Sequence, residues 1–169
     1  MEVKEMNLPS KIFKKGLPAG RQGFTLIEIL LVVAILSILL VVVFASLNPA
    51  QRLMDTRNAR RWSDVNQALT ALHECIIDKS LATCGLSNPL ALSQIGTCAS
   101  GGATLCTGAA AACLNLDADT DLDPYIAGFP KDPSTGSAAT TGYSIQITSG
   151  IVTISACSAE DGDTISVSR

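Results

Sequence analysis

"KKGLPAGRQGFTLIEILLVVAILSILLVVVFASL", which runs from Lys14 to Leu47, joins a basic segment to a long apolar run. The run from Phe24 to Leu47 has 24 residues and a single charged side chain, Glu28. About 20 apolar residues suffice for a helix to cross a bilayer. The apolar core of a secretory signal peptide has only roughly 7–15 residues. The stretch therefore predicts a membrane-spanning helix over residues 24–47.

Glu28 is the one residue of this run that a simple membrane anchor does not need. An acid near the middle of a span costs about 2.5–3.5 kcal/mol on insertion scales, and less near the interface. Acids inside membranes usually have a function and a partner. A cut between Gly23 and Phe24 would create such a partner, because the new α-amino group lies four residues before Glu28. The carboxylate also suits the positive end of the helix dipole.

Charge is distributed unevenly along the chain. Residues 1–23 contain five Lys or Arg against two acids, whereas residues 81–169 contain two basic residues against eight acids. A basic start and an acidic end favour a cytoplasmic N-terminus and an exported C-terminus. The excess of acids in residues 81–169 also repels phosphate groups, so we expect no nucleic-acid partner.

All the cysteines follow the apolar run, and their even number in a small exported domain favours disulfides. They allow fifteen pairings, which the sequence does not distinguish. A bond between Cys75 and Cys84 would close a short loop, and Cys157 would tie the predicted sheet to the preceding loops. A zinc site with His73 and Glu74 is the weaker interpretation, since the chain has no CxxC pair. The disulfide candidates are Cys75, Cys84, Cys98, Cys106, Cys113 and Cys157.

The segment G-F-T-L-I-E, Gly23 to Glu28, resembles the cleavage and methylation motif of type IV prepilins and type II secretion pseudopilins. The resemblance implies that Gly23 ends a leader over residues 1–23 and that Phe24 becomes the N-methylated mature N-terminus. It implies that Glu28 directs methylation and subunit docking. The implied partners are a prepilin peptidase, a membrane assembly platform, membrane lipid, further copies in a helical filament and related minor subunits.

The function implied is that of a structural subunit of a type IV pilus-like or secretion filament. The subunit is expected in the cytoplasmic membrane with a single span and its head outside, and then in an extracellular pilus or a periplasmic filament. The sequence shows no combination of a nucleophile, a base and a group that orients the base, so we expect no enzymatic activity. The alternative is a membrane-anchored extracytoplasmic binding module that does not polymerise.

Residues 48–80 have a helical pattern that continues the span as an amphipathic half. Pro49 predicts a kink, or else the first turn of a second helix. The predicted apolar face carries Met54, Trp62, Val65, Leu69, Leu72 and Ile76, opposite Arg60, Asp64, Gln67 and Glu74. The basic cluster Arg57–Arg61 is interpreted as solvated or, alternatively, as paired with acids of neighbouring subunits.

Residues 81–169 are predicted as a disulfide-stapled head. Residues 81–124 are loop-like, whereas 141–148, 151–157 and 164–168 alternate as strands with Gly-containing turns between them, which indicates an antiparallel meander. Its apolar face is assigned to Ile145, Ile147, Ile154 and Val167, or to the residues that alternate with them. The fold class is α+β and, by resemblance, pilin-like: a long N-terminal helix packed on a small antiparallel sheet.

Two motifs of the head remain. Asp117, Asp119, Asp121 and Asp123 alternate in a pattern that suits calcium, although Leu122 and Gly128 replace the Gly and Glu of an EF-hand loop. A solvated acidic loop is the alternative, and no other cofactor is expected. The segment around Pro130, Asp132 and Pro133 resembles a P-x-D-P turn of pilin-like heads, where Asp132 would cap its own backbone.

Overall fold

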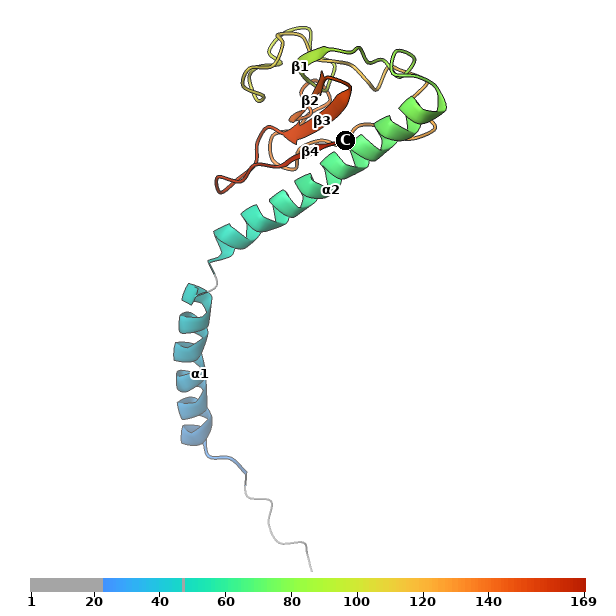
Figure 1. Cartoon of the computed structure of the whole chain (residues 1–169). Coiled ribbons are helices and arrows are strands. Elements are labelled where there is room, and N and C mark those ends of the chain that lie inside the picture. Colours follow the sequence, from blue (N-terminus) through green and yellow to red (C-terminus); the bar gives the residue numbers. More distant parts are fainter. Residues whose placement is uncertain (1–22, 47) are drawn as a thin grey trace, which may run out of the picture. The chain divides into compact units, whose positions relative to one another are not determined.

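The computed structural model describes residues 23–46 and 48–169. The first 22 residues of the predicted leader, and Leu47 at the end of the predicted span, lie outside the described residues. The chain divides into two compact units, Met1–Leu47 and Asn48–Arg169, and each is described by itself. Figure 1 labels their helices and strands.

The first unit contains one described helix, α1 (Leu26–Ser46), and none of its residues is buried. Apolar side chains lie all around it, and its few polar residues form no continuous polar face of the kind that a surface helix of a globular protein has. Among the described residues it is the one helix long and apolar enough to cross a membrane.

The second unit begins with α2 (Pro49–Asp78). Pro49 occupies the first turn, where its missing amide hydrogen costs nothing. Asn48 precedes it with a left-handed backbone, φ 37°. The interruption expected at Pro49 is therefore present, and it takes the form of the alternative in which Pro49 opens a second helix.

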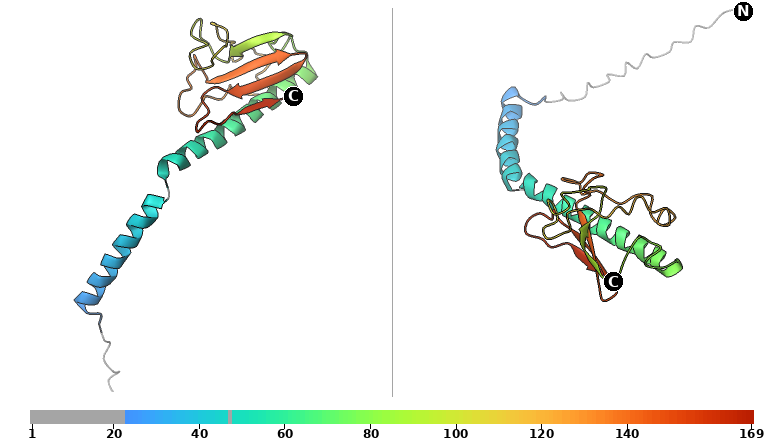
Figure 2. Two further views of the ribbon diagram at one scale, coloured as in Figure 1. Left: turned by 60° about the vertical axis from the view of Figure 1, so that its left-hand side comes forward. Right: turned by 90° about the horizontal axis from the view of Figure 1, so that it is seen from above.

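The sheet has four antiparallel strands in the order β1-β2-β3-β4, and α2 packs against β3 and β4. Figure 2 shows the strands side by side with α2 along one face of the sheet. The α+β class predicted from the sequence is confirmed. The strands are β1 (Leu90–Gln94), β2 (Tyr143–Thr148), β3 (Ile151–Ala156) and β4 (Ser166–Ser168).

The hairpin between β2 and β3 follows from its two turn residues. Thr148 pairs with Ile151, so Ser149 and Gly150 form a two-residue connection. Both have positive φ, 54° and 85°. Two-residue hairpins favour this backbone because it matches the twist of the flanking strands.

Strand β1 lies in a segment that the sequence pattern predicted as loop. Its sequence, LALSQ, lacks the β-branched residues that mark a strand. It forms a strand because β2 offers pairing partners, with Leu90 opposite Ile147 and Gln94 opposite Ser144. Its register shifts between Leu90 and Ser93, which further weakens the alternation that sequence reasoning relies on.

The core lies between α2 and the sheet. Val65, Leu69 and Leu72 of α2 are buried as predicted, and so are Ile145, Ile147 and Ile154 of the sheet, whereas Val167 is half-buried. The predicted helix face was wrong at two positions. Trp62 is 42% exposed, and Asp64, assigned to the solvent face, is buried.

Three disulfides pair all six cysteines of the chain. Cys75–Cys84 joins the end of α2 to the next loop, and Cys106–Cys157 joins a loop to the segment after β3. The third, Cys98–Cys113, lies within the loop region. A core with few aromatic residues therefore has three covalent staples.

Candidate functional site

The candidate processing and assembly site lies at the start of α1. The amide and the hydroxyl of Thr25 each donate a hydrogen bond of 2.9 Å to Oε2 of Glu28. In return, the amide of Glu28 donates to Oγ1 of Thr25 at 3.3 Å. This reciprocal arrangement is a capping box, T-x-x-E, which satisfies amide donors that a helix start otherwise leaves unpaired.

Sequence reasoning found the helix-dipole partner of Glu28 but missed this local one. The signal was present, because Thr25 and Glu28 have the spacing of a capping box directly before an apolar run. The carboxylate therefore already has hydrogen-bond donors on the uncut chain. A terminal amine created by cleavage would be an additional partner.

Gly23 and Phe24 precede the helix and are both exposed. A Cβ at Gly23 would meet no atom within 4 Å, so packing in the described chain does not require glycine there. The side chain of Phe24 is 82% exposed. A peptide bond between two exposed, non-helical residues suits access by a protease.

Three of the four aspartates predicted as calcium ligands have separate hydrogen-bond partners in the structure. Asp117 accepts a hydrogen bond from the amide of Phe129 at 2.8 Å, and Asp119 accepts one from the amide of Asp121 at 3.0 Å. Asp123 lines a cavity beside Asp117. Within residues 23–46 and 48–169, no three His, Cys, Asp or Glu side chains come close enough to hold a metal ion. Calcium at these residues stays a prediction.

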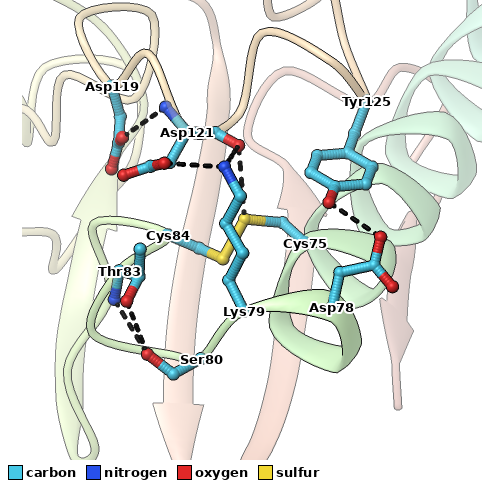
Figure 3. The surroundings of a disulfide bond; sticks show 9 residues. All are labelled: Cys75, Asp78, Lys79, Ser80, Thr83, Cys84, Asp119, Asp121 and Tyr125. Atoms are coloured by element: carbon cyan, nitrogen blue, oxygen red, sulfur yellow. Dashed lines mark hydrogen bonds and ion pairs between the residues drawn. A yellow bond between two sulfur atoms is a disulfide. The ribbon is translucent and has the colours of Figure 1, made fainter.

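Asp121 instead belongs to a cluster around the Cys75–Cys84 bond, drawn in Figure 3. Lys79 donates to its carboxylate at 2.6 Å and to its carbonyl at 3.2 Å. Tyr125 donates to Asp78 at 2.8 Å. These hydrogen bonds raise the pKa of Lys79 and the pKa of Tyr125 above their ordinary values. The cluster holds the 121–125 loop against the end of α2.

The basic cluster of α2 finds its acids within the same chain. Arg61 is fully buried, and its guanidinium binds Asp132 at 2.6 Å and Glu160 at 2.8 Å. Arg57 binds Glu160 from the other side at 2.7 Å. The interpretation of Arg57–Arg61 as solvated is therefore wrong for Arg61, whose counter-ions come from two distant loops. Only Arg60 remains largely exposed, 3.9 Å from Asp64.

Asp132 is both the predicted turn cap and the main counter-ion of Arg61. Its Oδ1 accepts hydrogen bonds from the amides of Ser134 and Thr135 at 2.9 and 3.0 Å. Burial would raise its pKa, but the Arg61 guanidinium and these amides outweigh burial and hold the pKa well below its usual range. Hydrogen bonds from Arg57 and then Arg61 lower the pKa of Glu160 to about 2.

A second buried polar contact joins α2 to the sheet. The hydroxyl of Tyr143 on β2 donates to Asp64 at 2.6 Å. Burial, and then this bond to a carboxylate, raise the pKa of Tyr143. The helical pattern contained no sign of this contact, because the partner is 79 residues away in sequence.

Comparison with known proteins identifies the N-terminal segment. Residues 18–44 match the family model of the prokaryotic N-terminal methylation motif. No curated protein and no solved structure matches the chain. The resemblance predicted from Gly23 to Glu28 is therefore confirmed: the chain carries the prepilin-type cleavage and methylation motif. Together with α1, the motif fits the membrane anchoring of a structural, pilin-type subunit.

Proposed function

We propose, from the premise that this chain is a type IV pilin-like or pseudopilin-like precursor, that it is cut after Gly23 and polymerises into a filament. The mature subunit begins at Phe24, whose amino group is methylated. It is held in the cytoplasmic membrane by α1 until an assembly platform extracts it. The observation that carries this proposal is the methylation-motif match over residues 18–44, which includes the cleavage junction, Glu28 and most of α1.

The physical basis of assembly is the unpartnered surface of α1. None of its apolar side chains is buried, so covering them from water needs lipid or other copies of the helix. Moving from lipid to a bundle of like helices exchanges one apolar environment for another, and close packing then decides the balance. The acidic head would face outward, in an extracellular pilus or a periplasmic filament.

Glu28 separates this proposal from the alternative of a membrane-anchored binding module that does not polymerise. The capping box alone would account for Glu28 in such an anchor, since it only requires a hydrogen-bond acceptor. Assembly, in contrast, would use the negative charge against the terminal amine of the same or a neighbouring subunit. The two roles differ in whether glutamine can replace the residue.

The test compares Glu28→Gln with Glu28→Ala and Thr25→Ala in a strain that assembles the wild-type chain. Glutamine keeps a capping oxygen but no charge, whereas Thr25→Ala removes the cap and leaves the carboxylate. If charge drives assembly, both Glu28 variants reach the membrane but form no filaments, and Thr25→Ala still forms them. Filaments from Glu28→Gln in wild-type amounts would contradict the charge role. Intact-mass analysis of the mature chain checks the cut after Gly23 and the added methyl group.

A further inference from the structure

The face of α2 that points away from the core separates its charges by sign. Arg52 and Arg60 lie in the first half of the helix, whereas Glu74 and Asp78 lie near its end. All four of these residues are exposed. At 3.6 residues per turn they fall within an arc of about 80°, opposite the buried Val65. Between the two pairs, this face carries the exposed and uncharged residues Ser63, Gln67 and Thr70.

This order of charges does not stabilise the helix that carries it. The helix dipole favours anions at the N-terminal end of a helix and cations at the C-terminal end. α2 has no acid in its first turn and no basic residue in its last turn. Arg52 lies in the first turn instead, and Asp78 is the last residue of the helix. An arrangement that is unfavourable for the single helix favours a role in a contact between molecules.

Contacts within the chain leave these charges largely available. Within residues 23–46 and 48–169, Arg52 and Glu74 take part in no salt bridge. Arg60 lies 3.9 Å from the carboxylate of Asp64, which is too long for a hydrogen bond. Asp78 accepts one hydrogen bond through Oδ2, which leaves Oδ1 for a second donor. The face therefore presents two cations and two anions to a partner.

The two ends of this face match one another at a single displacement along the helix. Arg52 and Glu74 are 22 residues apart, which is about 33 Å along the axis. Arg60 and Asp78 are 18 residues apart, or about 27 Å. Neither pair can form within one copy at these distances. A second copy displaced by about 30 Å brings both pairs to within about 3 Å along the axis, which an arginine side chain can span.

Each end of α2 also carries a large apolar side chain that the fold leaves uncovered. Leu53, next to Arg52, is 59% exposed, and Ile77, next to Asp78, is 78% exposed. The two residues are 24 residues apart, so the same displacement brings them to within roughly one helical turn of each other. Covering them would remove apolar surface from water, which is favourable.

We propose that the start of α2 in one copy docks on the end of α2 in the next copy, with Arg52 and Arg60 opposite Glu74 and Asp78. The partner is a second copy because the two complementary halves lie on the same face of the same chain. A contact between different patches of one molecule is heterologous, and its repetition generates a helical filament when the rotation does not close. The inference rests on the proposed function and deepens it by naming a contact between subunits.

An anionic bilayer surface is the other occupant that the arginines could attract. Acids beside the same end of α2 disfavour it. Gln51 donates a hydrogen bond to Asp161 at 2.6 Å, and Asn58 donates one to Asp163 at 2.8 Å. Both donors lie about 100° or more around the helix from Arg52. A broad anionic surface would meet these acids as well as the arginines, whereas a second helix can contact the arginine side alone.

The test reverses the charges singly and together in the full-length chain, in a strain that assembles the wild type. Arg52→Glu and Glu74→Arg each turn an attractive contact into a repulsive one, so each should lower the amount of filament roughly fivefold or more. The double variant restores opposite charges and should recover at least about half of the wild-type amount. Because the two residues are too far apart to meet in one copy, recovery reports a contact between copies.

Two controls separate a lost contact from a lost fold. Each single reversal places the charge that the helix dipole favours, so the melting temperature of the mature chain in detergent should not fall. Lys131→Glu is the matched control, because it reverses an exposed charge that does not lie on α2. It should leave the amount of filament unchanged, and an equal loss from Lys131→Glu would overturn the inference in favour of an effect of net charge.

The remaining outcomes are distinct. A double variant that assembles no better than the single ones, or wild-type amounts from both single variants, would overturn the inference while the proposed function stands. Loss of filaments with Arg52→Glu but not with Glu74→Arg would overturn it in favour of the membrane surface. If the wild-type chain forms no filaments, the proposed function fails and the inference is overturned with it.

Discussion

The two helices differ in where their charged side chains find partners. In α1, Glu28 has Thr25 as its partner among the described residues, and no side chain of the helix is buried. In α2, Arg61 lies in the core and is neutralised by Asp132 and Glu160, which come from loops 71 and 99 residues away. The C-terminal unit therefore pairs the buried Arg61 with acids of its own fold, whereas the apolar side chains of α1 depend on surroundings outside the chain.

This difference shows where each segment obtains its stability. A buried charge is tolerated only when it is paired and hydrogen-bonded. The C-terminal unit meets that requirement by folding, so its stability should depend on single internal contacts. The described part of the first unit buries no side chain, so changes there should alter membrane location and assembly but not folding.

The largest expected effect is that of removing Arg61. Arg61→Ala leaves Asp132 buried without its main partner, and breaking a buried pair costs about 3–5 kcal/mol. Arg60→Ala is the control, because Arg60 is exposed and exposed pairs contribute only about 0–1 kcal/mol. Urea unfolding of both variants measures the two free energies. Equal losses in the free energy of unfolding would mean that the buried ion pair of Arg61 and Asp132 does not stabilise the C-terminal unit.

The stability lost on opening a disulfide should increase with the length of the loop that the bond closes. In the chain-entropy model, opening Cys106–Cys157 by paired Ser substitution costs about 4 kcal/mol, and opening Cys75–Cys84 costs about 3 kcal/mol. The bonds span 51 and 9 residues. Thermal unfolding of the two double variants gives the order. A reversed order would show that the cluster around Lys79 and Asp121 depends on its disulfide more than chain entropy predicts.

Acid should weaken the C-terminal unit. Glu160 has an ordinary pKa of 4.5 that falls to about 2 in the folded chain. The pKa of Asp132 is lowered in the same direction. A lowered pKa means that the folded state binds protons less readily than the unfolded state, so its contribution is present above about pH 4.5 and is lost towards pH 2. The melting temperature should fall over this window. For Glu160→Gln the difference from wild type should shrink as the pH falls; a constant difference would rule out this titration.

The smallest expected effect is that of removing residues 1–47. The buried residues begin at Asn58, so the fragment 48–169 retains the whole core and all three disulfides. We expect its melting temperature to match that of the mature chain in detergent within a few degrees, whereas membrane association is lost. Failure of the fragment to fold would show that the C-terminal unit needs the first unit for its stability.

Much of this architecture could be predicted from local patterns. The apolar run, the motif from Gly23 to Glu28 and the strand alternation after Thr141 depend on neighbouring residues, so one sequence suffices to find them. The prediction failed where distant residues override a local preference. Strand β1 forms because β2 pairs with it, and the true face of α2 is turned away from Trp62 because Arg61 and Asp64 find partners in remote segments.

The candidate sites divide in the same way. The capping box of Thr25 and Glu28 and the methylation motif are short, contiguous signals. The positions of the four aspartates and the cavity beside Asp117 depend on how the loops after β1 fold back on α2, which no local pattern encodes.

By itself, the sequence determined that the chain has an apolar helix with a prepilin-type junction and a cysteine-rich head, because hydrophobic length and motif spacing are properties of adjacent residues. Only the tertiary structure decided which charges are buried, which cysteines are bonded to each other and which aromatic side chain is left outside. The physical reason is that burial and pairing are set by contacts across tens of residues, and such contacts exist only once the chain has folded.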